Sequence, residues 1–387
     1  MSEHVLTAIR DLLPVLRERA QATEDARVVP TESIKELREA GFFRLLQPTR
    51  FGGHEADPVT FYTAVRLISS ACGSTGWVSS VLGAHAWHVA TFPAEAQEEL
   101  WGRDPAALVS SAYAPVGRAT AVDGGYRLSG TWNFSSGVNH ASAAILGALI
   151  MGEDGRPADW VAFLVPREDY TVHDVWRTVG LRGTGSNDVV VEDVFVPAHR
   201  VLSFADSFRC ACPGQEVNPG PLYRIPLYSL MTTTIATPLV GMATGAYEAH
   251  VAHQRRRVRV FAGEKVKDDP FAKVRVARAA SEVDAAWLQL TRNITEIYDT
   301  ARRGESIPIE LRLRLRRDQV RASERCIAAV DQLFENSGAG ALAEGTPIQR
   351  FWRDAHAARV HVANDPEAAL KLFGDGEFGE DVTVGML

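Results

Sequence analysis

The apolar residues of the chain follow three patterns in succession. Leu6, Ile9, Leu13 and Leu16 recur at helical spacing, and helical signals continue to about residue 100. Apolar and polar residues then alternate to about residue 200, as strands require, before the helical period returns. The pattern predicts an α+β fold of four parts: an N-terminal α-helical domain (1–105), a central β-barrel domain (106–202), a loop or lid (203–227) and a C-terminal helical bundle (228–387).

Turn residues and prolines refine the prediction for the β domain and for the loop that follows it. Asp123-Gly124-Gly125 is a hairpin signal between two alternating runs, which favours a barrel or a sandwich of antiparallel strands. Segment 203–226 holds four prolines and two cysteines, so it is expected to be a long loop. Loops of this length are often lids, and this one is expected to decide substrate size.

A helix is predicted near the end of the chain, from Thr346 to Pro366. Thr346 suits a helix cap and Pro347 the first helical position, and Asn364-Asp365-Pro366 is a stop signal. At helical spacing, Arg350, Asp354 and His361 share one face beside an apolar stripe. An imidazole next to an apolar stripe is a candidate for chemistry, whereas the alternative is an Arg–Asp surface pair with a structural histidine.

Composition excludes several classes of function. The chain has 387 residues, 46% of them apolar, with a net charge of −7, which argues against a nucleic-acid partner. Its four cysteines have no metal-ligand spacing, so we expect no metal site and free thiols. Without a signal pattern or an apolar run long enough for a bilayer, the chain is expected to be cytoplasmic, with no membrane partner.

Several motifs in one order resemble the acyl-CoA dehydrogenase superfamily over nearly the whole chain. They are Gly41-Phe42-Phe43, Phe51-Gly52-Gly53, Trp132 to Gly137, Leu181 to Ser186, Glu192 to Pro197 and Arg353-Asp354-Ala355. Where the dehydrogenases of that family place a glutamate base, this chain has His361-Val362-Ala363-Asn364. Because valine cannot abstract a proton, the departure argues against dehydrogenation.

A second set of motifs resembles the flavin-dependent monooxygenase branch of that fold, the oxygenase components of two-component phenol hydroxylases. The motifs are Cys72 to Trp77, Gly83 to His88, Ser110 to Pro115 and Trp132 to Gly137. They are most similar to oxygenases that hydroxylate a phenolic seco-steroid, and hydroxylases of aromatic polyketides are similar enough to leave the substrate open. The resemblance implies ortho-hydroxylation of a phenol to a catechol through a flavin C4a-hydroperoxide. Reduced FMN or FAD would arrive as a diffusible cosubstrate from a separate NAD(P)H:flavin reductase, and O₂ would be the oxidant.

The same resemblance implies the catalytic residues. Ser136, with Ser135 beside it, would accept a hydrogen bond from flavin N5. His361 would deprotonate the phenol or orient the peroxide, since histidine titrates near neutral pH. His85 and Ser111 would support it, although His88 is the alternative for His85. We expect His140, His250 and His253 to be structural.

The resemblance also implies how the flavin would be held. Trp77, Tyr113, Trp132 and Phe134 would supply apolar stacking surfaces, although each aromatic residue alone is more often part of a core. Arg257 or Arg259 would bind the flavin phosphate. The Asn336 to Gly340 turn and Gln349 would reach the cofactor of a neighbouring subunit, which implies a homotetramer.

Two other functions remain open from the sequence. One is a flavin-dependent N-oxygenase or oxidase of the same fold that acts on an amine, which the aromatic candidate walls disfavour. The other is a catalytically silent flavin-binding homologue, which the presence of His361, Ser136 and Ser111 disfavours. No glycine-rich dinucleotide fingerprint occurs in the required strand–helix context, in agreement with a separate reductase.

Overall fold

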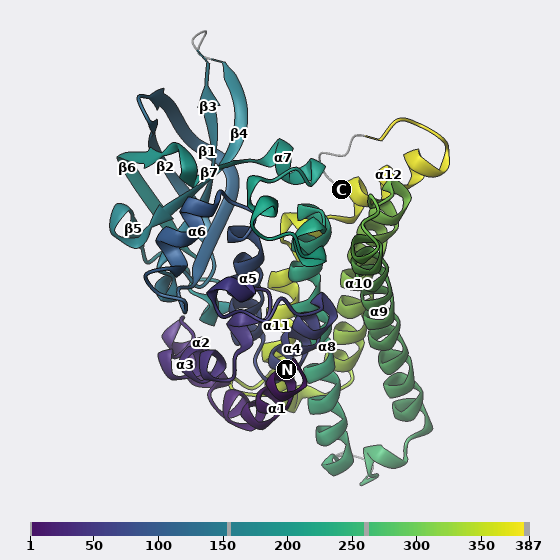
Figure 1. The fold of residues 1–387 in the computed structure, drawn as a ribbon. Coiled ribbons are helices and arrows are strands. Elements are labelled where there is room, and N and C mark those ends of the chain that lie inside the picture. The colour runs from purple at the N-terminus through teal and green to yellow at the C-terminus, as the bar shows by residue number, and fades with distance from the viewer. Residues whose placement is uncertain (1, 153–155, 259–262, 383–387) are drawn as a thin grey trace.

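The computed structural model describes residues 2–152, 156–258 and 263–382, and it has the predicted α+β architecture. A helical N-terminal part and a curved sheet lie beside a bundle of long C-terminal helices (Figure 1). The N-terminal helices are α1 (Ser2–Glu18), α2 (Ala20–Ala26), α3 (Thr31–Glu39), α4 (Pro58–Ala71), α5 (Gly73–Val89) and α6 (Ala94–Trp101). No helix of the described residues combines the length and the apolarity needed to cross a bilayer.

Helix α5 is the centre of the molecule. Nearly all of its side chains are buried, because it contacts α4 and α8 as well as the first strand of the sheet. Gly76 and Gly83 permit this packing, since a Cβ at either position would overlap Ser69 or Phe61. A helix buried on all sides can present residues to the sheet and to the bundle at once (Figure 1).

The β domain is one sheet of seven strands in the order β5-β6-β2-β1-β3-β4-β7. The strands are β1 (Val109–Val122), β2 (Gly125–Ser135), β3 (Ala143–Met151), β4 (Pro157–Pro166), β5 (Thr171–His173), β6 (Asn187–Pro197) and β7 (Val201–Ser203). Among the strands that the structure describes, β1 and β3 are the one pair that runs parallel.

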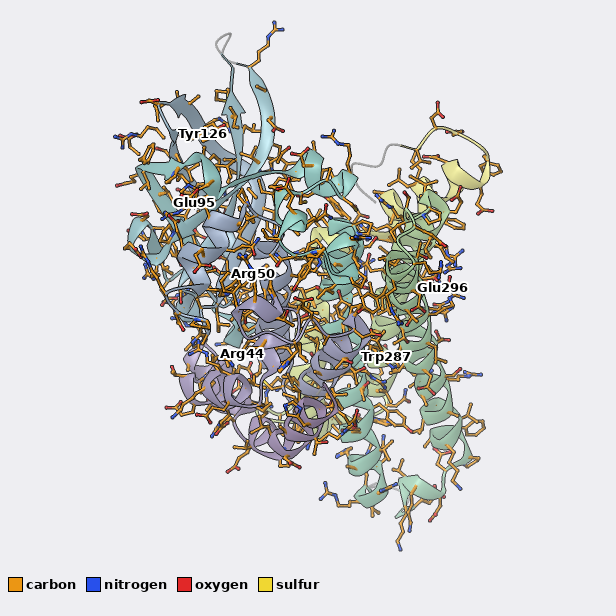
Figure 2. All side chains as sticks on the ribbon, in the orientation of Figure 1. Arg44, Arg50, Glu95, Tyr126, Trp287 and Glu296 are labelled. Carbon is orange, nitrogen blue, oxygen red and sulfur yellow. The ribbon has the colours of Figure 1, made fainter. Side chains whose placement is uncertain are left out.

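The sheet is curled into an open barrel. Strands β4 and β6 touch although three strands lie between them in the sheet order. Tyr126 of β2, labelled in Figure 2, packs its ring against that of Phe163 on β4, with centroids 5.6 Å apart. The edge strands β5 and β7 do not pair with each other in the described residues, so the predicted barrel is not closed.

Segment 203–227 is a packed cover rather than the open loop expected from its prolines. It contains α7 (Phe204–Arg209) and two 3₁₀ turns, at Pro213–Glu216 and Pro221–Arg224. The prolines start these turns, because their fixed φ suits the first helical position. Trp87 Nε1 of α5 donates to the Leu222 carbonyl over 2.8 Å, which ties the cover to the central helix.

Five helices form the C-terminal bundle: α8 (Leu227–Arg256), α9 (Pro270–Arg302), α10 (Ile309–Glu335), α11 (Pro347–Arg359) and α12 (Pro366–Glu377). Helix α8 begins at Leu227 and passes through Pro238. Its first half is rich in threonine, a weak helix former, but the hydroxyls of Thr233 and Thr237 bond to backbone carbonyls four residues earlier. Tertiary packing therefore overrides propensity in this segment.

Helix α11 ends at Arg359, so the prediction that His361 lies on its face is wrong. The Asn364 side chain folds back and donates to the Ala358 carbonyl over 2.9 Å, which satisfies one of the last carbonyls of the helix. Its Oδ1 accepts from Gln319 and Ser323 of α10. His361 therefore lies in a turn between α11 and α12 that Asn364 fixes to the bundle.

Replacing Asn364 with alanine should destabilise the protein by about 2–4 kcal/mol, because the change leaves buried donors and an acceptor without partners. The exposed Asn133→Ala is the matched control and should change stability by less than about 0.5 kcal/mol. Urea unfolding of both variants measures the difference. Equal midpoints for the two variants would contradict the role given to Asn364.

Candidate active site

Helix α5 presents the candidate residues in one row. Trp77, His85 and His88 are eight and three residues apart, a spacing that keeps them on neighbouring parts of one helix face. At about 1.5 Å per residue, Trp77 and His85 lie roughly 12 Å apart along the axis. The site therefore has a Trp77 end, near the last bundle turn, and a His85 end, near β1.

At the Trp77 end, the predicted Ser136 is held in a chain of hydroxyl groups. Trp77 Nε1 donates to Ser136 Oγ over 3.1 Å, and Ser136 Oγ lies 2.7 Å from Ser186 Oγ. Ser186 Oγ is in turn 2.7 Å from Thr184 Oγ1, which donates to the Leu181 carbonyl.

The end of this chain sets the direction of every proton in it. A hydroxyl has one proton, and that of Thr184 points to a carbonyl, so Thr184 accepts from Ser186 and Ser186 accepts from Ser136. The Ser136 proton is committed to Ser186, and the remaining lone pair of Ser136 is free to accept a further hydrogen bond. Ser136 is therefore built as an acceptor, the role that an N–H group of a ligand requires.

The loop that carries Thr184 and Ser186 is itself fixed by Asp354 of α11. The Leu181 N–H donates to Asp354 Oδ1 over 2.6 Å, and Gly183 N–H donates to Ser74 Oγ at the start of α5. Asp354 is buried, and burial raises the pKa of its carboxyl to about 6. A Cβ at Gly73 would lie 2.7 Å from Asp354 Oδ2, so the glycine allows this close approach.

A cluster of charges anchors the other side of α11. Arg350 and Arg353 both contact the carboxylate of Glu24 on α2, across more than 320 residues of sequence. The two guanidinium groups lower the pKa of Glu24 against the opposing effect of burial. The Arg350–Asp354 surface pair considered from the sequence does not form, because each residue has a different buried partner.

His361 lies at the Trp77 end of the site. Its ring packs edge-on against Trp77, with centroids 5.8 Å apart, and its Nδ1 accepts from the Ala363 N–H over 3.1 Å. Burial by surrounding elements lowers the pKa of His361 to about 4, and the nearby Arg316 charge adds to the effect. The lowered pKa keeps the ring neutral at pH 7.

The hydrogen bond to Nδ1 also decides which nitrogen of His361 carries the proton. A neutral imidazole that accepts at Nδ1 has its proton on Nε2. In this conformation His361 can donate to a ligand through Nε2, whereas taking a proton from a phenol would require the Ala363 bond to break. The geometry therefore favours orientation of an oxygen atom over deprotonation.

At the other end, His85 and Ser111 form a hydrogen-bonded pair. His85 Nδ1 donates to the Val109 carbonyl over 2.6 Å, which leaves Nε2 as an acceptor for the Ser111 hydroxyl, 2.9 Å away. Burial lowers the pKa of His85 to about 4, so the ring is neutral. A ligand hydroxyl that donates to Ser111 Oγ would thus reach a histidine base through one serine.

Tyr113 and His88 lie beside this pair. The Tyr113 hydroxyl is 2.8 Å from His88 Nδ1, and the two rings meet edge-on at 5.2 Å. Phe204 of α7 covers both rings, at 5.7 Å from Tyr113 and 6.4 Å from His88. His88 Nε2 is buried without a partner, and burial lowers the pKa of this ring to about 3.

Two of the predicted cofactor contacts lie in the β-domain core. Trp132 is fully buried and donates to the Gly147 carbonyl, and the Ser135 hydroxyl donates to Ser110. Their side chains do not line the site in this structure, because β2 is irregular between Trp132 and Ser135, and this irregularity lets two residues three positions apart both face inward. Phe134 points outward with φ +67°, is 69% exposed and packs edge-on against Trp176.

The residues predicted to bind phosphate lie at the far end of α8. Arg257 donates to the Asn336 carbonyl over 2.9 Å and packs on Gly338. It therefore contacts the Asn336 to Gly340 turn, which is expected to reach the cofactor of a neighbouring subunit. Arg259 is outside the described residues. Gln349 is buried and accepts from Arg353 over 2.6 Å, which leaves its amide nitrogen for another partner.

These groups fit a flat aromatic ligand that carries an N–H donor. Ser136 is an oriented acceptor, and exposed apolar side chains follow close by in the sequence: Phe134 before Ser136, and Val360 and Val362 on either side of His361, at 83% and 81% exposure. Isoalloxazine has both features. Sequence reasoning found Ser136 but missed Thr184, Ser186 and the Val109 carbonyl, whose roles depend on contacts between distant segments.

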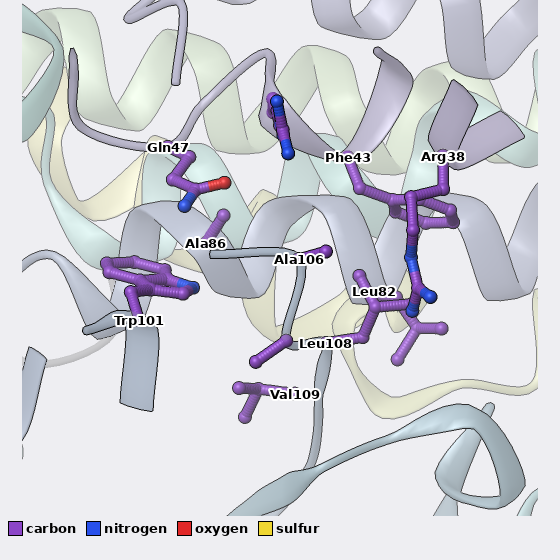
Figure 3. Close-up of a pocket in the computed structure, with 11 residues that line it drawn as sticks. Arg38, Phe43, Gln47, Leu82, Ala86, Trp101, Ala106, Leu108 and Val109 are labelled. Carbon is purple, nitrogen blue, oxygen red and sulfur yellow. The ribbon is translucent and has the colours of Figure 1, made fainter. Parts of the chain in front are cut away.

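A small cavity lies between α5 and the start of β1. Leu82, Ala86 and Val109 line it together with Arg38 and Arg44 (Figure 3). Its volume of about 10 Å³ suits about one water molecule. It is too small for an aromatic substrate.

Among the described residues, one cluster of side chains could bind a metal ion, and it lies apart from the candidate active-site residues. Glu95 and Glu99 of α6 approach His199, and Figure 2 labels Glu95 beside the sheet. Arg200 already ion-pairs with Glu99 over 2.5 Å, so a cation is present at this position. The cluster is adequately explained as a surface ion-pair network.

Comparison with known proteins gives a consistent set of relatives. The models for the N-terminal and C-terminal domains of acyl-CoA dehydrogenase match residues 6–107 and 233–366. The chain is 61% identical over 377 residues to "Flavin-dependent monooxygenase, oxygenase subunit HsaA" of Rhodococcus jostii (strain RHA1), covering 97% of this chain and 98% of that one. It is 38% identical to "FADH(2)-dependent resorcinol hydroxylase, oxygenase component" of Rhizobium sp. (strain MTP-10005), covering 94% and 91%.

Solved structures agree with these relatives. The crystal structure of 3-HSA hydroxylase from Rhodococcus sp. RHA1 superposes with a TM-score of 0.96 at 59% identity and covers 99% of both chains. The structure of XiaF from Streptomyces sp., in complex with FADH2 and glycerol, superposes with a TM-score of 0.92 at 30% identity and covers 98% of this chain and 96% of that one.

Replacing Ser186 with alanine should weaken the site without unfolding it. The Ser136 proton then loses its acceptor, so the hydroxyl can rotate and point its proton outward. We expect flavin affinity to fall about 10-fold, as for loss of one well-oriented hydrogen bond, measured by equilibrium titration with flavin. Ser80→Ala, which removes a buried hydroxyl from α5 outside this chain, is the control. Equal affinity in both variants would remove the orienting role of Ser186.

The buried His88 predicts a specific loss of stability in acid. Its pKa falls from 6.5 to about 3 on folding, so between these values the unfolded chain binds a proton that the folded chain does not, and stability is lost as pH falls through this window. In His88→Phe the decline should be shallower by up to about 1.4 kcal/mol per pH unit. Urea unfolding between pH 7 and 4 measures the slope, and parallel slopes for the two proteins would contradict burial of a neutral ring.

Proposed function

The chain belongs to the oxygenase subunits of flavin-dependent monooxygenases built on the acyl-CoA dehydrogenase fold, and on that premise we propose that it hydroxylates a phenolic, steroid-derived substrate at the ortho position. The observation that carries the proposal is the paired geometry along α5. An oriented acceptor, Ser136, stands at one end, and a serine–histidine pair stands at the other. The product would be a catechol.

The proposed reaction needs two electrons and O₂, one oxygen atom entering the phenol and the other leaving as water. Reduced flavin, once bound, would supply those electrons and return to its oxidised form. A relative of this chain is called an oxygenase subunit and another an oxygenase component. Those names support a partner reductase that delivers the reduced flavin. Both FMN and FAD are compatible with the proposal.

At the Trp77 end, Ser136 would hold the flavin by accepting from its N5–H. Trp77 fixes the position of Ser136, and the hydroxyl chain to Leu181 fixes its proton. His361 would donate from Nε2 to an oxygen atom beside the flavin. Its lowered pKa keeps it neutral, so it orients this atom without adding a charge.

At the His85 end, Ser111 would accept the phenol proton while its own proton moves to His85 Nε2. The Val109 carbonyl then stabilises the imidazolium through Nδ1–H. Because the pKa of His85 is low, this proton transfer is unfavourable before the reaction begins. It becomes favourable only as the phenol ring is oxidised and the phenol hydroxyl becomes more acidic. The packed cover 203–227 excludes water from this end through Phe204.

The remaining parts of the proposal concern assembly. Arg257 is half-buried against the Asn336 to Gly340 turn, with no carboxylate partner among the described residues, which supports contact with a flavin phosphate from a second copy of the chain. A homotetramer would bring Arg257 of one copy close to the flavin of another.

Turnover of a phenol panel distinguishes this function from amine oxidation, and flavin binding without product would indicate a silent homologue.

His361→Ala should keep flavin binding within a few-fold and lower hydroxylation by about 10²-fold or more, the usual contribution of a well-placed acid–base or orienting group. Catechol formation and flavin affinity are measured on the same preparation with a supplied reductase. His356→Ala is the control, because His356 lies on α11 and packs against Trp352 away from the site. Unchanged product formation in His361→Ala would exclude this assignment.

A further inference from the structure

Two arginines of α10 are buried without a carboxylate. Arg312 and Arg316 are 9% and 8% exposed, and lie one turn apart on the same helix face. Neither ion-pairs with an acidic residue of the described chain. The other arginines of this helix behave differently: Arg314, Arg317, Arg321 and Arg325 each pair with a glutamate or an aspartate.

The partners of the two buried guanidinium groups are neutral. Arg312 donates to the Phe208 carbonyl over 3.1 Å and to Cys210 Sγ at 3.9 Å, while its Nε is buried without a partner. Arg316 donates through Nη1 alone, to Gln319 and to the Ala363 carbonyl. A guanidinium has five N–H donors, so several remain unused in each group.

Burying like charges side by side is costly. Desolvation lowers the pKa of Arg316 to about 10, although Tyr228 and the charge of Asp365 act in the opposite direction. Asp206, the acidic residue of α7, is already paired with Arg209. An anion bound by both guanidinium groups would compensate the two buried charges.

The position of the pair connects it with the candidate active site. Arg316 bonds to the turn that carries His361, and Arg312 bonds to the C-terminal end of α7 in the cover. Figure 1 shows α7 between the sheet and the ends of the bundle helices. Aromatic rings lead from Tyr113 through Phe204 and Phe208 to Tyr228, each within 6.1 Å of the next.

We propose that Arg312 and Arg316 bind an oxyanion, a carboxylate or a phosphate group, of a ligand that lies beside His361. The anion accepts from both guanidinium groups and links the cover to the His361 turn. Two sources supply this chemistry: an acidic group at the far end of the phenolic substrate, or the phosphate of the flavin, which would then lie here instead of at Arg257. The first source rests on the function proposed above, whereas the anion site itself does not.

The test begins with inorganic phosphate and needs neither oxygen nor a phenol, so its outcome is independent of the proposed reaction. Phosphate at millimolar concentration should raise the melting temperature of the unmodified protein, because a ligand of the folded state stabilises it. The double variant R312Q/R316Q should lose this shift. Its matched control is R321Q/R325Q, two arginines with the same spacing on the same helix that have carboxylate partners, and it should retain the shift.

Two further titrations identify the source of the anion. For a phenol that ends in a carboxylate, R312Q/R316Q should raise KM about 10-fold or more relative to the same phenol ending in a carboxamide. If the flavin phosphate is the anion, the unmodified protein should instead bind FMN about 10-fold or more tighter than riboflavin, and R312Q/R316Q should lose this preference. The single variant R316K, which keeps the charge but not the fork, replaces the double variant if that protein does not fold.

If phosphate raised the melting temperature of R312Q/R316Q as much as that of the unmodified protein, the proposed anion site would be wrong. The absence of any shift in the unmodified protein, combined with unchanged preferences in both titrations, would also overturn the site. Loss of the shift together with either preference supports the site and names its ligand. Loss of the shift alone supports a site for a free oxyanion.

Discussion

The hydrogen bond from Trp77 to Ser136 joins the three parts of the molecule. Trp77 belongs to the central helix, Ser136 follows strand β2, and the edge of Trp77 also meets His361 after α11. The serine is useful because its proton is committed elsewhere, along a chain that ends at a backbone carbonyl. A loop that shifted by an ångström would break this chain, so the buried Asp354 and the glycines facing it are part of the same arrangement.

The sequence predicts most of the fold, because hydrophobic periodicity is a local signal. It distinguishes the helical parts from the alternating β part, and the hairpin signal at Gly124 marks a real turn between β1 and β2. It fails where distant contacts decide the outcome. The threonine-rich start of α8 is helical because it is packed, and α11 stops at Arg359 because Asn364 bonds to α10 and to the helix end.

The candidate site is predictable to a similar extent. Motifs on α5 and β1 single out His85 and Ser111 separately, but their hydrogen bond to each other, and the tautomer that the Val109 carbonyl gives His85, appear only in the structure. Ser135 and Trp132 show the reverse case. Both lie in a motif with Ser136, yet the irregularity of β2 between them turns both side chains into the core. Buried arginines without carboxylate partners leave no pattern in the sequence, since surface arginines have the same spacing.

The contacts of Glu24 with Arg350 and Arg353 have a consequence for biosynthesis. These residues are separated by more than 320 positions, and α11 also contacts the start of α5, where Gly73 meets Asp354. On the ribosome, the first hundred residues emerge long before α11 exists. The surfaces of α2 and α5 that α11 covers must therefore stay exposed until synthesis is almost complete. Folding intermediates of this protein are expected to depend on chaperones more than its final stability would suggest.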